Sequence, residues 1–316
     1  MIISASRRTD IPAFYSEWFM NRLKAGYVLT RNPMNHAQVS KIMLSPEVVD
    51  CIVFWTKDAK NIMGKLKSVD DLGYRYYFQF TLTPYDREIE PYLREKERII
   101  DTFIELSEKI GKDKVIWRYD PIILNDKVTA EYHLEWFEYL CGRLKRYTNV
   151  CNISFVDIYS KLSRTVKNMV LREITGEEMI ALASGFSGIA VRYGIELKAC
   201  CERADLSEYG VGPASCIDQT VIERICGCSL EVKAEKNQRE GCRCMQSIDI
   251  GAYNTCRHGC VYCYANVGFA AVENNSLKHN PASGILIGTV NPDEKVTEKK
   301  MKSFKNYNYN LWSDIK

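Results

Sequence analysis

The chain has 316 residues, of which 46% are hydrophobic and 26% charged, a composition typical of a globular protein with a sizeable core. Its formal net charge of +3 is small for this length and no run of basic residues occurs, so nucleic acid is not indicated as a partner. No apolar stretch approaches the roughly 20 residues needed to cross a bilayer, and residues 1–8 lack the apolar core of a signal peptide. We therefore expect a cytoplasmic protein with no membrane partner.

Short runs of apolar residues predict a series of β-strands along the first 200 residues. Most of these runs are continuous rather than alternating, as in parallel strands that are covered on both faces. The predicted strands are Ile2–Ser6, Tyr27–Arg31 (the weakest), Cys51–Thr56, Tyr76–Thr83, Lys114–Tyr119, Asn152–Asp157 and Ile195–Cys201.

Helical patterns lie between these strands. Pro12–Ala25 carries apolar residues at helical spacing behind a proline suited to a first turn. Glu177–Tyr193 follows a capping-box sequence that begins at Thr175, and it stops before Gly194. Two further helices are predicted over Glu90–Ile110 and Ala130–Arg146. The alternation predicts an α/β fold whose parallel sheet curves into a full or partial TIM-like (β/α) barrel.

Polar side chains follow almost every predicted strand, at the end where β/α barrels place their active sites. Arg7 and Arg8 follow the first strand, Lys57 follows the strand at Cys51–Thr56, and Arg118 and Asp120 come at the end of Lys114–Tyr119. The cations could bind an anionic ligand, or they could form salt bridges with loop acids. We expect these residues in the active site. Other polar candidates at the same edge are Ser6, Thr9, Asp10, Thr56, Asp58, Thr81, Thr83, Tyr85, Tyr119, Asp157, Tyr159, Glu202 and Arg203.

The thirteen cysteines are unevenly distributed, since ten of them lie between Cys200 and Cys263. Thiols stay reduced in the cytoplasm, so a cluster of soft thiolates indicates zinc or iron–sulfur rather than disulfides. The remaining Cys51, Cys141 and Cys151 are typical of small buried hydrophobic residues. We divide the chain into barrel units over 1–200, a cysteine-rich cluster-binding segment that completes the barrel over 201–289, and a surface tail over 290–316.

Cys256, Cys260 and Cys263 have the spacing C-x3-C-x2-C, and Gly259 lets the loop between them turn through an unusual backbone angle. Three local thiolates can hold three irons of a [4Fe–4S] cluster and leave the fourth open to a small molecule, whereas structural zinc requires four closed ligands. A cluster or zinc site without such a molecule, or unligated core cysteines, are the alternatives. His258, inside the loop, is expected to point to solvent.

This segment resembles the signature of the radical S-adenosylmethionine (SAM) superfamily, in which an aromatic residue precedes the third cysteine and lies near the SAM adenine, as Tyr262 would. The resemblance implies reductive cleavage of SAM to methionine and a 5′-deoxyadenosyl radical, which abstracts hydrogen from a substrate that the sequence does not identify. It also implies an external electron donor such as flavodoxin or ferredoxin.

The late position of the triad departs from that superfamily, in which the triad follows the first strand of a partial barrel. Here it follows Ser247–Tyr253, one more predicted strand, and precedes a helix-prone segment, Tyr262–Ala271. We favour circular permutation, with Ser247–Tyr253 acting as the family's first strand, over a ferredoxin-like domain appended to an ordinary barrel.

A second metal site is predicted on Cys201, Cys216, Cys242 and Cys244, because four thiolates would close either an auxiliary iron–sulfur cluster or a zinc site. The pair Cys226 and Cys228 competes for the same role, and reduced buried thiols are the other alternative. Cys200 alternates with Cys201 along a strand, so only one of them is expected to face the rim.

Four stretches of the chain resemble the domain-of-unknown-function-1848 family: Ser4–Pro12, Phe54–Lys57, Trp117–Pro121 and Asp249–Asn266. The resemblance extends to about residues 279–283 and implies no assigned substrate. The favoured function is a radical SAM enzyme. The alternative is a non-catalytic zinc or iron–sulfur module that binds nucleic acid or protein.

Overall fold

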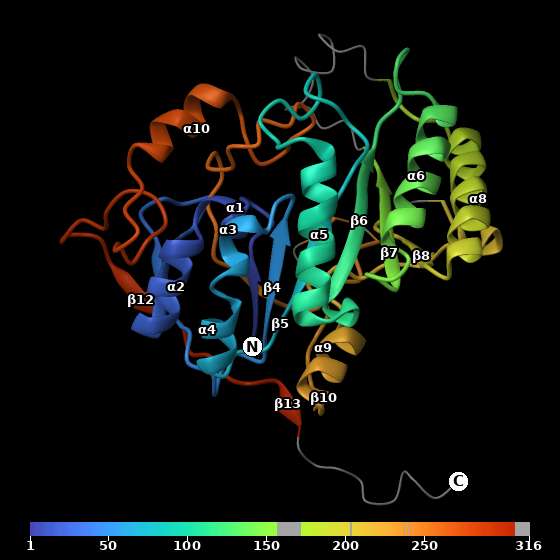
Figure 1. Ribbon diagram of the computed structural model, residues 1–316. Coiled ribbons are helices and arrows are strands. Elements are labelled where there is room, and N and C mark those ends of the chain that lie inside the picture. Colours follow the sequence, from blue (N-terminus) through green and yellow to red (C-terminus); the bar gives the residue numbers. More distant parts are fainter. Residues whose placement is uncertain (157–171, 203, 237, 240, 307–316) are drawn as a thin grey trace, which may run out of the picture.

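The computed structural model describes residues 1–156, 172–202, 204–236, 238–239 and 241–306 (Figure 1). Its centre is an eight-stranded sheet in which every pair of neighbouring strands is parallel. In spatial order the strands are β11 (Ile248–Asp249), β1 (Ile2–Ala5), β4 (Cys51–Thr56), β5 (Tyr76–Thr81), β6 (Val115–Ile122), β7 (Val150–Phe155), β8 (Glu196–Ala199) and β9 (Gly212–Pro213). The predicted α/β class with a parallel sheet is confirmed. Among the described strands, β9 and β11 form the two edges of this sheet.

Helices that follow the strands cover one face of the sheet (Figure 1). They are α1 (Ile11–Phe14), α2 (Ser16–Ala25), α3 (Lys60–Met63), α4 (Leu66–Asp71), α5 (Lys96–Ile110), α6 (Ala130–Leu144) and α8 (Gly176–Tyr193). Two more helices, α9 (Gln219–Cys226) and α10 (Phe269–Ser276), lie in the cysteine-rich half, with short 3-10 turns at Lys112–Lys114 and Ser207–Tyr209.

The predicted helix boundaries hold where local capping signals are strong. The Thr175 hydroxyl accepts a hydrogen bond from the Glu178 amide, and the Glu178 carboxylate accepts one from the Thr175 amide, so the predicted capping box forms at the start of α8. The predicted helix Pro12–Ala25 is instead two helices, because the chain leaves helical geometry at Tyr15. The predicted helix Glu90–Ile110 starts only at Lys96, because the Glu90 side chain is buried and hydrogen-bonded to Lys57 and Tyr262 instead of lying on an exposed helix face.

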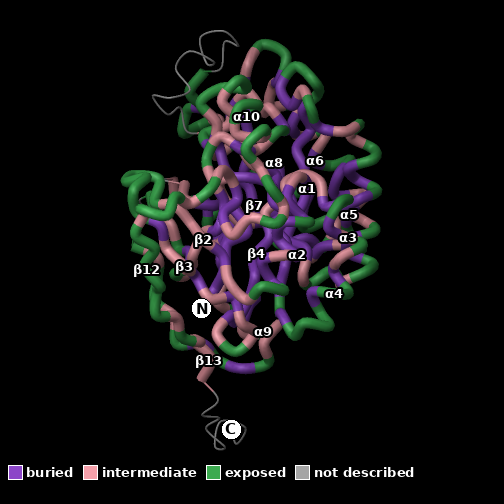
Figure 2. Tube along the Cα trace, turned by 90° about the vertical axis from the view of Figure 1, so that its left-hand side faces the viewer, coloured by how far each residue is buried: buried purple, intermediate pink, exposed green. Residues whose placement is uncertain are grey.

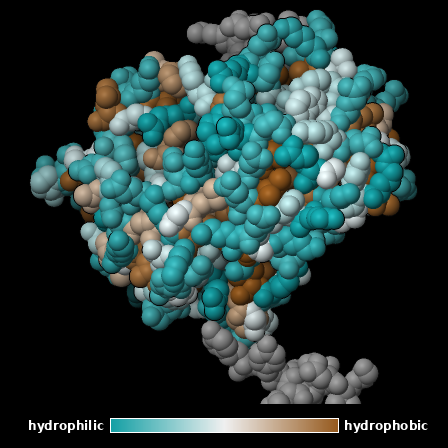
Figure 3. Space-filling model, in the orientation of Figure 1, coloured by the Kyte–Doolittle hydropathy of each residue, from teal (hydrophilic) through white to brown (hydrophobic). Residues whose placement is uncertain are grey.

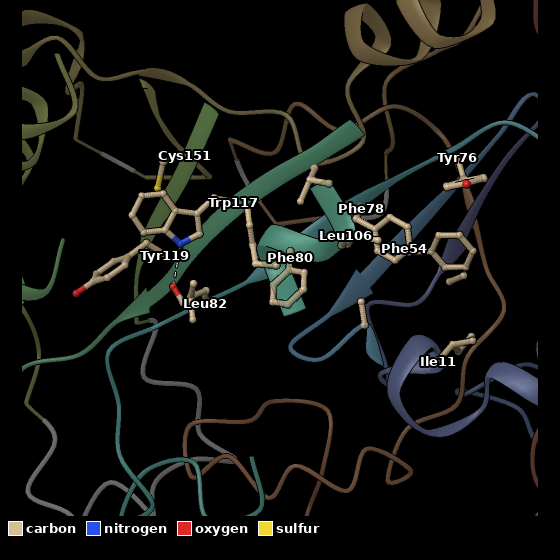
Figure 4. Packing of buried hydrophobic residues seen from close by; sticks show 14 of the residues in the cluster. Ile11, Phe54, Tyr76, Phe78, Phe80, Leu82, Leu106, Trp117, Tyr119 and Cys151 are labelled. Atoms are coloured by element: carbon tan, nitrogen blue, oxygen red, sulfur yellow. Dashed lines mark hydrogen bonds between the residues drawn. The ribbon is translucent and has the colours of Figure 1, made fainter. Parts of the chain in front are cut away.

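Side chains alternate across the strands and create two cores. Phe54, Phe78 and Trp117 belong to the core on the helix side, in which the Phe54 and Phe78 rings stack with centroids 4.7 Å apart (Figure 4). Val53 and Tyr77 face the other side and pack against the segment 214–245, which includes α9. Both faces of the central strands are therefore covered, which explains why their sequences are continuously apolar.

Two smaller sheets join distant parts of the chain. Strand β2 (Tyr27–Arg31), predicted as a weak strand, lies outside the main sheet and pairs antiparallel with β3 (Val39–Met43), beside β12 (Val296–Glu298) (Figure 2). Strand β13 (Lys305–Asn306) pairs with β10 (Ser229–Leu230). The Asp50 carboxylate accepts hydrogen bonds from the Ser303 hydroxyl at 2.5 Å and the Phe304 amide at 2.8 Å. The described part of the expected surface tail is thus attached to the main body.

The surface in the view of Figure 3 is largely hydrophilic, with apolar residues in separate small patches. Among the described helices, none has both the length and the apolar character that a membrane crossing requires.

Trp117 provides a test of the helix-facing core. Its side chain is fully buried, stacks on Phe137 with ring centroids 5.1 Å apart, and donates from Nε1 to the Leu82 carbonyl at 2.9 Å. We expect Trp117→Ala to lower the free energy of unfolding by about 3–5 kcal/mol, because it leaves a large cavity. Urea unfolding of the reduced apoprotein measures this. Val191→Ala, at an exposed position of α8, is the control and should change stability by less than about 0.5 kcal/mol. Equal effects of the two substitutions would contradict the described core.

Candidate functional site

The C-terminal ends of the sheet strands open into a cavity of about 500 Å³. Every residue predicted for the active site, the cysteine triad and the second metal site lines this one cavity. These residues are Arg7, Arg8, Lys57, Arg118, Asp120, Cys201, Cys216, Cys242, Cys244, Cys256, Cys260, Tyr262 and Cys263. Five of the other polar candidates also line the cavity: Ser6, Thr9, Asp10, Thr56 and Thr81. Five do not: Asp58, Thr83, Tyr85, Tyr119 and Glu202. The remaining candidates, Asp157, Tyr159 and Arg203, lie outside the described residues.

Asp249 fixes the entry to the triad beside the end of β1. Its carboxylate accepts hydrogen bonds from the hydroxyls of Ser4 at 2.8 Å and Ser6 at 2.6 Å, and from the Arg7 amide at 2.8 Å. Gly251 follows, and a Cβ at this position would lie 2.2 Å from the Ser6 hydroxyl, so only glycine fits. The predicted strand Ser247–Tyr253 is therefore real but short, since β11 ends at Asp249 where this network begins.

Asp10 connects three segments around a single carboxylate. It caps α1 through the Ala13 amide at 2.9 Å, and it accepts from the Thr56 hydroxyl at 3.0 Å and the Lys57 amide at 2.8 Å beyond β4. The Nε2 atom of His258 lies 2.8 Å from the same carboxylate. His258 is only 4% exposed, so the expectation that it points to solvent was wrong. The His258 ring is buried because it interacts with the buried Asp10 carboxylate, a partner that no local sequence pattern reveals.

The cysteine triad lies on a tightly turned loop after β11. Gly259 has φ of +69°, as expected for this turn, and a Cβ there would lie 2.5 Å from the Tyr92 ring. Burial raises the pKa of the Cys260 thiol to about 12 although the Lys57 charge opposes the rise, and burial likewise raises the pKa of Cys256 and Cys263. The three thiols therefore need a bound cation to become thiolates.

The chain after the triad turns without forming a helix until residue 269. The predicted helix Tyr262–Ala271 is wrong over its first part, because α10 begins only at Phe269. The Asn254 side chain accepts from the Val267 amide at 2.7 Å, and Asn266 donates to the Cys256 carbonyl at 2.8 Å. These side-chain bonds compete with helical geometry and close the triad loop instead.

Glu90 is a buried carboxylate of the site that sequence reasoning missed. Its oxygens accept hydrogen bonds from Lys57 at 2.6 Å, Lys96 at 3.1 Å, the Thr83 hydroxyl at 2.8 Å and the Tyr262 phenol. Burial by itself would raise the pKa of the Glu90 carboxyl, but the charges of Lys57 and Lys96 outweigh it and lower that pKa to about 2. In the sequence Glu90 is one acid among many at the start of an amphipathic helix, and it carries no distinguishing signal.

Two guanidinium groups lie close to the Trp55 ring at the pocket wall. The Arg7 and Arg118 guanidinium carbons lie 5.2 Å and 5.0 Å from its centroid. Arg118 is buried and donates to the Cys216 sulfur at 2.6 Å and to Asp120. The Arg7 Nη2 atom is buried and has no hydrogen-bond partner within the described part of the chain. Arg118 is thus satisfied internally, while Arg7 retains a donor for a ligand.

Five thiols beyond β8 form a closed ring of contacts. The Cys200 sulfur lies 3.3 Å from that of Cys216 and 3.7 Å from that of Cys201. Cys242 interacts with Cys201 and with Cys244, and Cys244 interacts with Cys216. The expectation that only one of Cys200 and Cys201 faces the rim was wrong, because Cys201 lies beyond the end of β8 with φ of +59°. Strand alternation therefore no longer applies to it.

The competing pair Cys226 and Cys228 lies away from this ring. The Cys226 sulfur donates to the Asp50 carbonyl at 3.3 Å, at the start of β4 rather than at its C-terminal end. Across the residues that the structure describes, no three His, Cys, Asp or Glu side chains already form a metal-binding group. Both predicted metal sites therefore remain predictions at this point.

A family model described as Domain of unknown function (DUF1848) matches residues 2–265. The match includes every residue that lines the cavity. No curated protein was found to match the chain.

Glu90→Gln tests the buried charge network. The substitution keeps the shape but leaves the ammonium groups of Lys57 and Lys96 without a counter-ion, so we expect a loss of about 3–5 kcal/mol of unfolding free energy at neutral pH. The pKa of Glu90 is depressed from 4.5 to about 2 on folding, so its stabilisation is complete above about pH 4.5 and disappears as the pH falls toward 2. The gap between the two proteins should close across this window in urea titrations at several pH values.

The matched control is Glu88→Gln, which removes an exposed carboxylate that pairs with Lys127. It should have little effect at any pH, since exposed ion pairs contribute little. A Glu90→Gln protein as stable as the control at neutral pH would show that the lysines are not held by this carboxylate.

Proposed function

The chain belongs to the DUF1848 family, and we propose that it is a radical SAM enzyme whose sheet is a partial (β/α) barrel of circularly permuted order. One observation carries the proposal. The triad Cys256, Cys260 and Cys263 follows a strand that pairs in parallel with β1, and its thiols line the cavity at the strand ends. A ferredoxin-like appendage would have no reason to share that cavity.

The strand order supports permutation. In the superfamily that the triad resembles, the cysteine loop follows the first strand of a partial barrel. Here β11 is the last of the eight main-sheet strands along the chain, but it lies at the edge of the sheet beside β1, with Ile248 opposite Ile3 and Asp249 opposite Ser4. The order β11-β1-β4-β5-β6-β7-β8 matches what we would expect of a partial barrel in which the family's first strand follows the others in sequence.

The donor set suits a cluster with one open iron. Three thiols from one loop can bind three irons, and the cavity beside them leaves space for SAM. When bound, a [4Fe–4S] cluster supplies the electron that cleaves SAM to methionine and a 5′-deoxyadenosyl radical, which abstracts hydrogen from the substrate. An external donor of the flavodoxin or ferredoxin class would deliver that electron.

Lys57, Glu90 and Tyr262 form one positioning unit beside the triad. The Lys57 ammonium lies 5.5 Å from the Tyr262 ring centroid, and both side chains bind the Glu90 carboxylate. The Tyr262 ring is thereby fixed in the cavity, where we propose that it contacts the SAM adenine. The Lys57 charge also acts on Cys260 and favours its thiolate.

His258 and Arg7 each offer a buried polar atom that has no hydrogen-bond partner in the described part of the chain. With Nε2 against Asp10, the Nδ1 atom of His258 is buried and has no partner among the described residues. A neutral ring would accept through Nδ1, and a protonated ring would donate. The spare donor of Arg7 suits the SAM carboxylate or an anionic substrate. We propose that Arg8 supplies a further positive charge for such an anion. The paired Arg118 and Asp120 side chains would form the adjacent wall of the cavity.

Anaerobic reconstitution with iron and sulfide tests the function. The reduced protein should give an EPR signal of a [4Fe–4S] cluster that changes on addition of SAM, and mass spectrometry should detect 5′-deoxyadenosine. Replacing Cys256, Cys260 or Cys263 individually by serine should reduce both signals to background, because each thiolate holds a different iron.

Cys226→Ser is the matched control, since this cysteine lies in the same half of the chain but away from the cavity, and it should behave as the unmodified protein. Bound zinc alone, or a cluster whose EPR signal ignores SAM, would overturn the proposal in favour of a non-catalytic metal module.

A further inference from the structure

We infer that Cys201, Cys216, Cys242 and Cys244 bind one tetrahedral zinc ion, which joins the two edges of the open sheet across the cavity. This inference does not depend on the proposed function. Four of the five thiols in the ring supply the donor number that structural zinc requires, and all four line the cavity at the strand ends.

The thiols come from the segments that flank the two edges. Cys201 follows β8, Cys216 follows the edge strand β9, and Cys242 and Cys244 precede the opposite edge strand β11. These segments are already in contact. The Met245 amide donates to the Ile217 carbonyl at 3.0 Å, and the Ser215 hydroxyl donates to the Arg243 carbonyl at 2.9 Å. A zinc ion here would therefore reinforce the contact that these hydrogen bonds already make between the two segments.

Direct contact between the ligand thiols favours a single ion over a second cubane. With zinc–sulfur bonds of about 2.3 Å, the sulfurs of a tetrahedral site stand about 3.8 Å apart, so neighbouring ligands touch. Cys242 interacts with Cys201 and Cys244, and Cys244 interacts with Cys216, so the four proposed ligands are neighbours in this way. In a cubane each thiolate binds a different iron, which holds the sulfurs further apart than direct contact. The described thiols are neighbours, but they are not arranged around a common centre as metal ligands are. Binding of the ion would therefore move the four ligand sulfurs toward it.

The charges around the ring suit a thiolate site. Zinc with four thiolates carries two negative charges, and such a site needs nearby donors. Arg118 donates to the Cys216 sulfur at 2.6 Å, and the Ile217 amide lies 3.5 Å from the Cys244 sulfur. The Arg7 guanidinium lies 5.2 Å from the centroid of the same Trp55 ring that Arg118 approaches, and it supplies a second cation at this wall. Neutral buried thiols would give these cations little to bind.

Metal analysis tests the inference in a protein whose triad cysteines are all serine, so that an iron–sulfur cluster on the triad cannot contribute. After purification the protein should hold about one zinc per chain, and cobalt substitution should give the visible spectrum of a tetrahedral thiolate site. Cys216→Ser and Cys244→Ser should each lower the zinc content at least about tenfold. Cys200→Ser and Cys226→Ser should retain it.

A second measurement uses the unsubstituted chain. Iodoacetamide should leave the four ligand cysteines unlabelled until a chelator removes zinc, as peptide mapping by mass spectrometry shows. No bound metal, iron with sulfide in place of zinc, or labelling that ignores the chelator would overturn the inference. Loss of zinc in Cys200→Ser with retention in Cys201→Ser would overturn the assigned ligand set. SAM cleavage enters none of these readouts, so failure here is distinguishable from failure of the proposed function.

Discussion

The Asp10 carboxylate is the interaction on which the arrangement of the cavity depends. A buried charge has to be satisfied by hydrogen bonds, and Asp10 obtains them from α1, from the loop after β4 and from His258. Each partner comes from a different part of the chain, so one carboxylate fixes their relative positions. Asp249 does the same for β11 and the end of β1. Together the two acids hold the cysteine loop against strands that precede it by some 240 residues.

The sequence predicted those features that depend on local pattern. Continuous apolar runs such as Cys51–Thr56 identified the central strands, and the spacing of the triad with Gly259 identified its turn. Features that depend on distant partners were missed. The burial of His258 requires Asp10, and the late start of α5 follows from the lysines around Glu90. The hairpin of β2 and β3 likewise takes its third strand from residues 296–298.

The small net charge of the whole chain conceals a cavity with several cations. Arg7, Arg8, Lys57 and Arg118 line it together with the thiols and with the acids Asp10, Asp120 and Asp249. Lys57 pairs with the buried Glu90, Arg118 with Asp120 and Arg8 with Asp249, while Arg7 retains a donor that has no partner among the described residues. Electrostatic focusing in such a concave, partly buried site makes local charge more informative than the overall value. The cavity therefore suits ligands that bring negative charge, such as thiolate-bound metals and carboxylates.

The pairing of β1 with β11 also has a consequence for how the molecule is made. Ile3 lies opposite Ile248, so this contact has one of the largest sequence separations in the fold, and such contacts form slowly. During synthesis one edge of β1 stays bare until almost the entire domain has left the ribosome. An unpaired strand edge is a template for aggregation, and a nascent chain of this topology is exposed to that hazard for most of its translation. Because the cysteine loop follows the other strand–helix units in the chain, the edge of β1 is unprotected during most of synthesis. The cavity can form only after β11 has paired with β1.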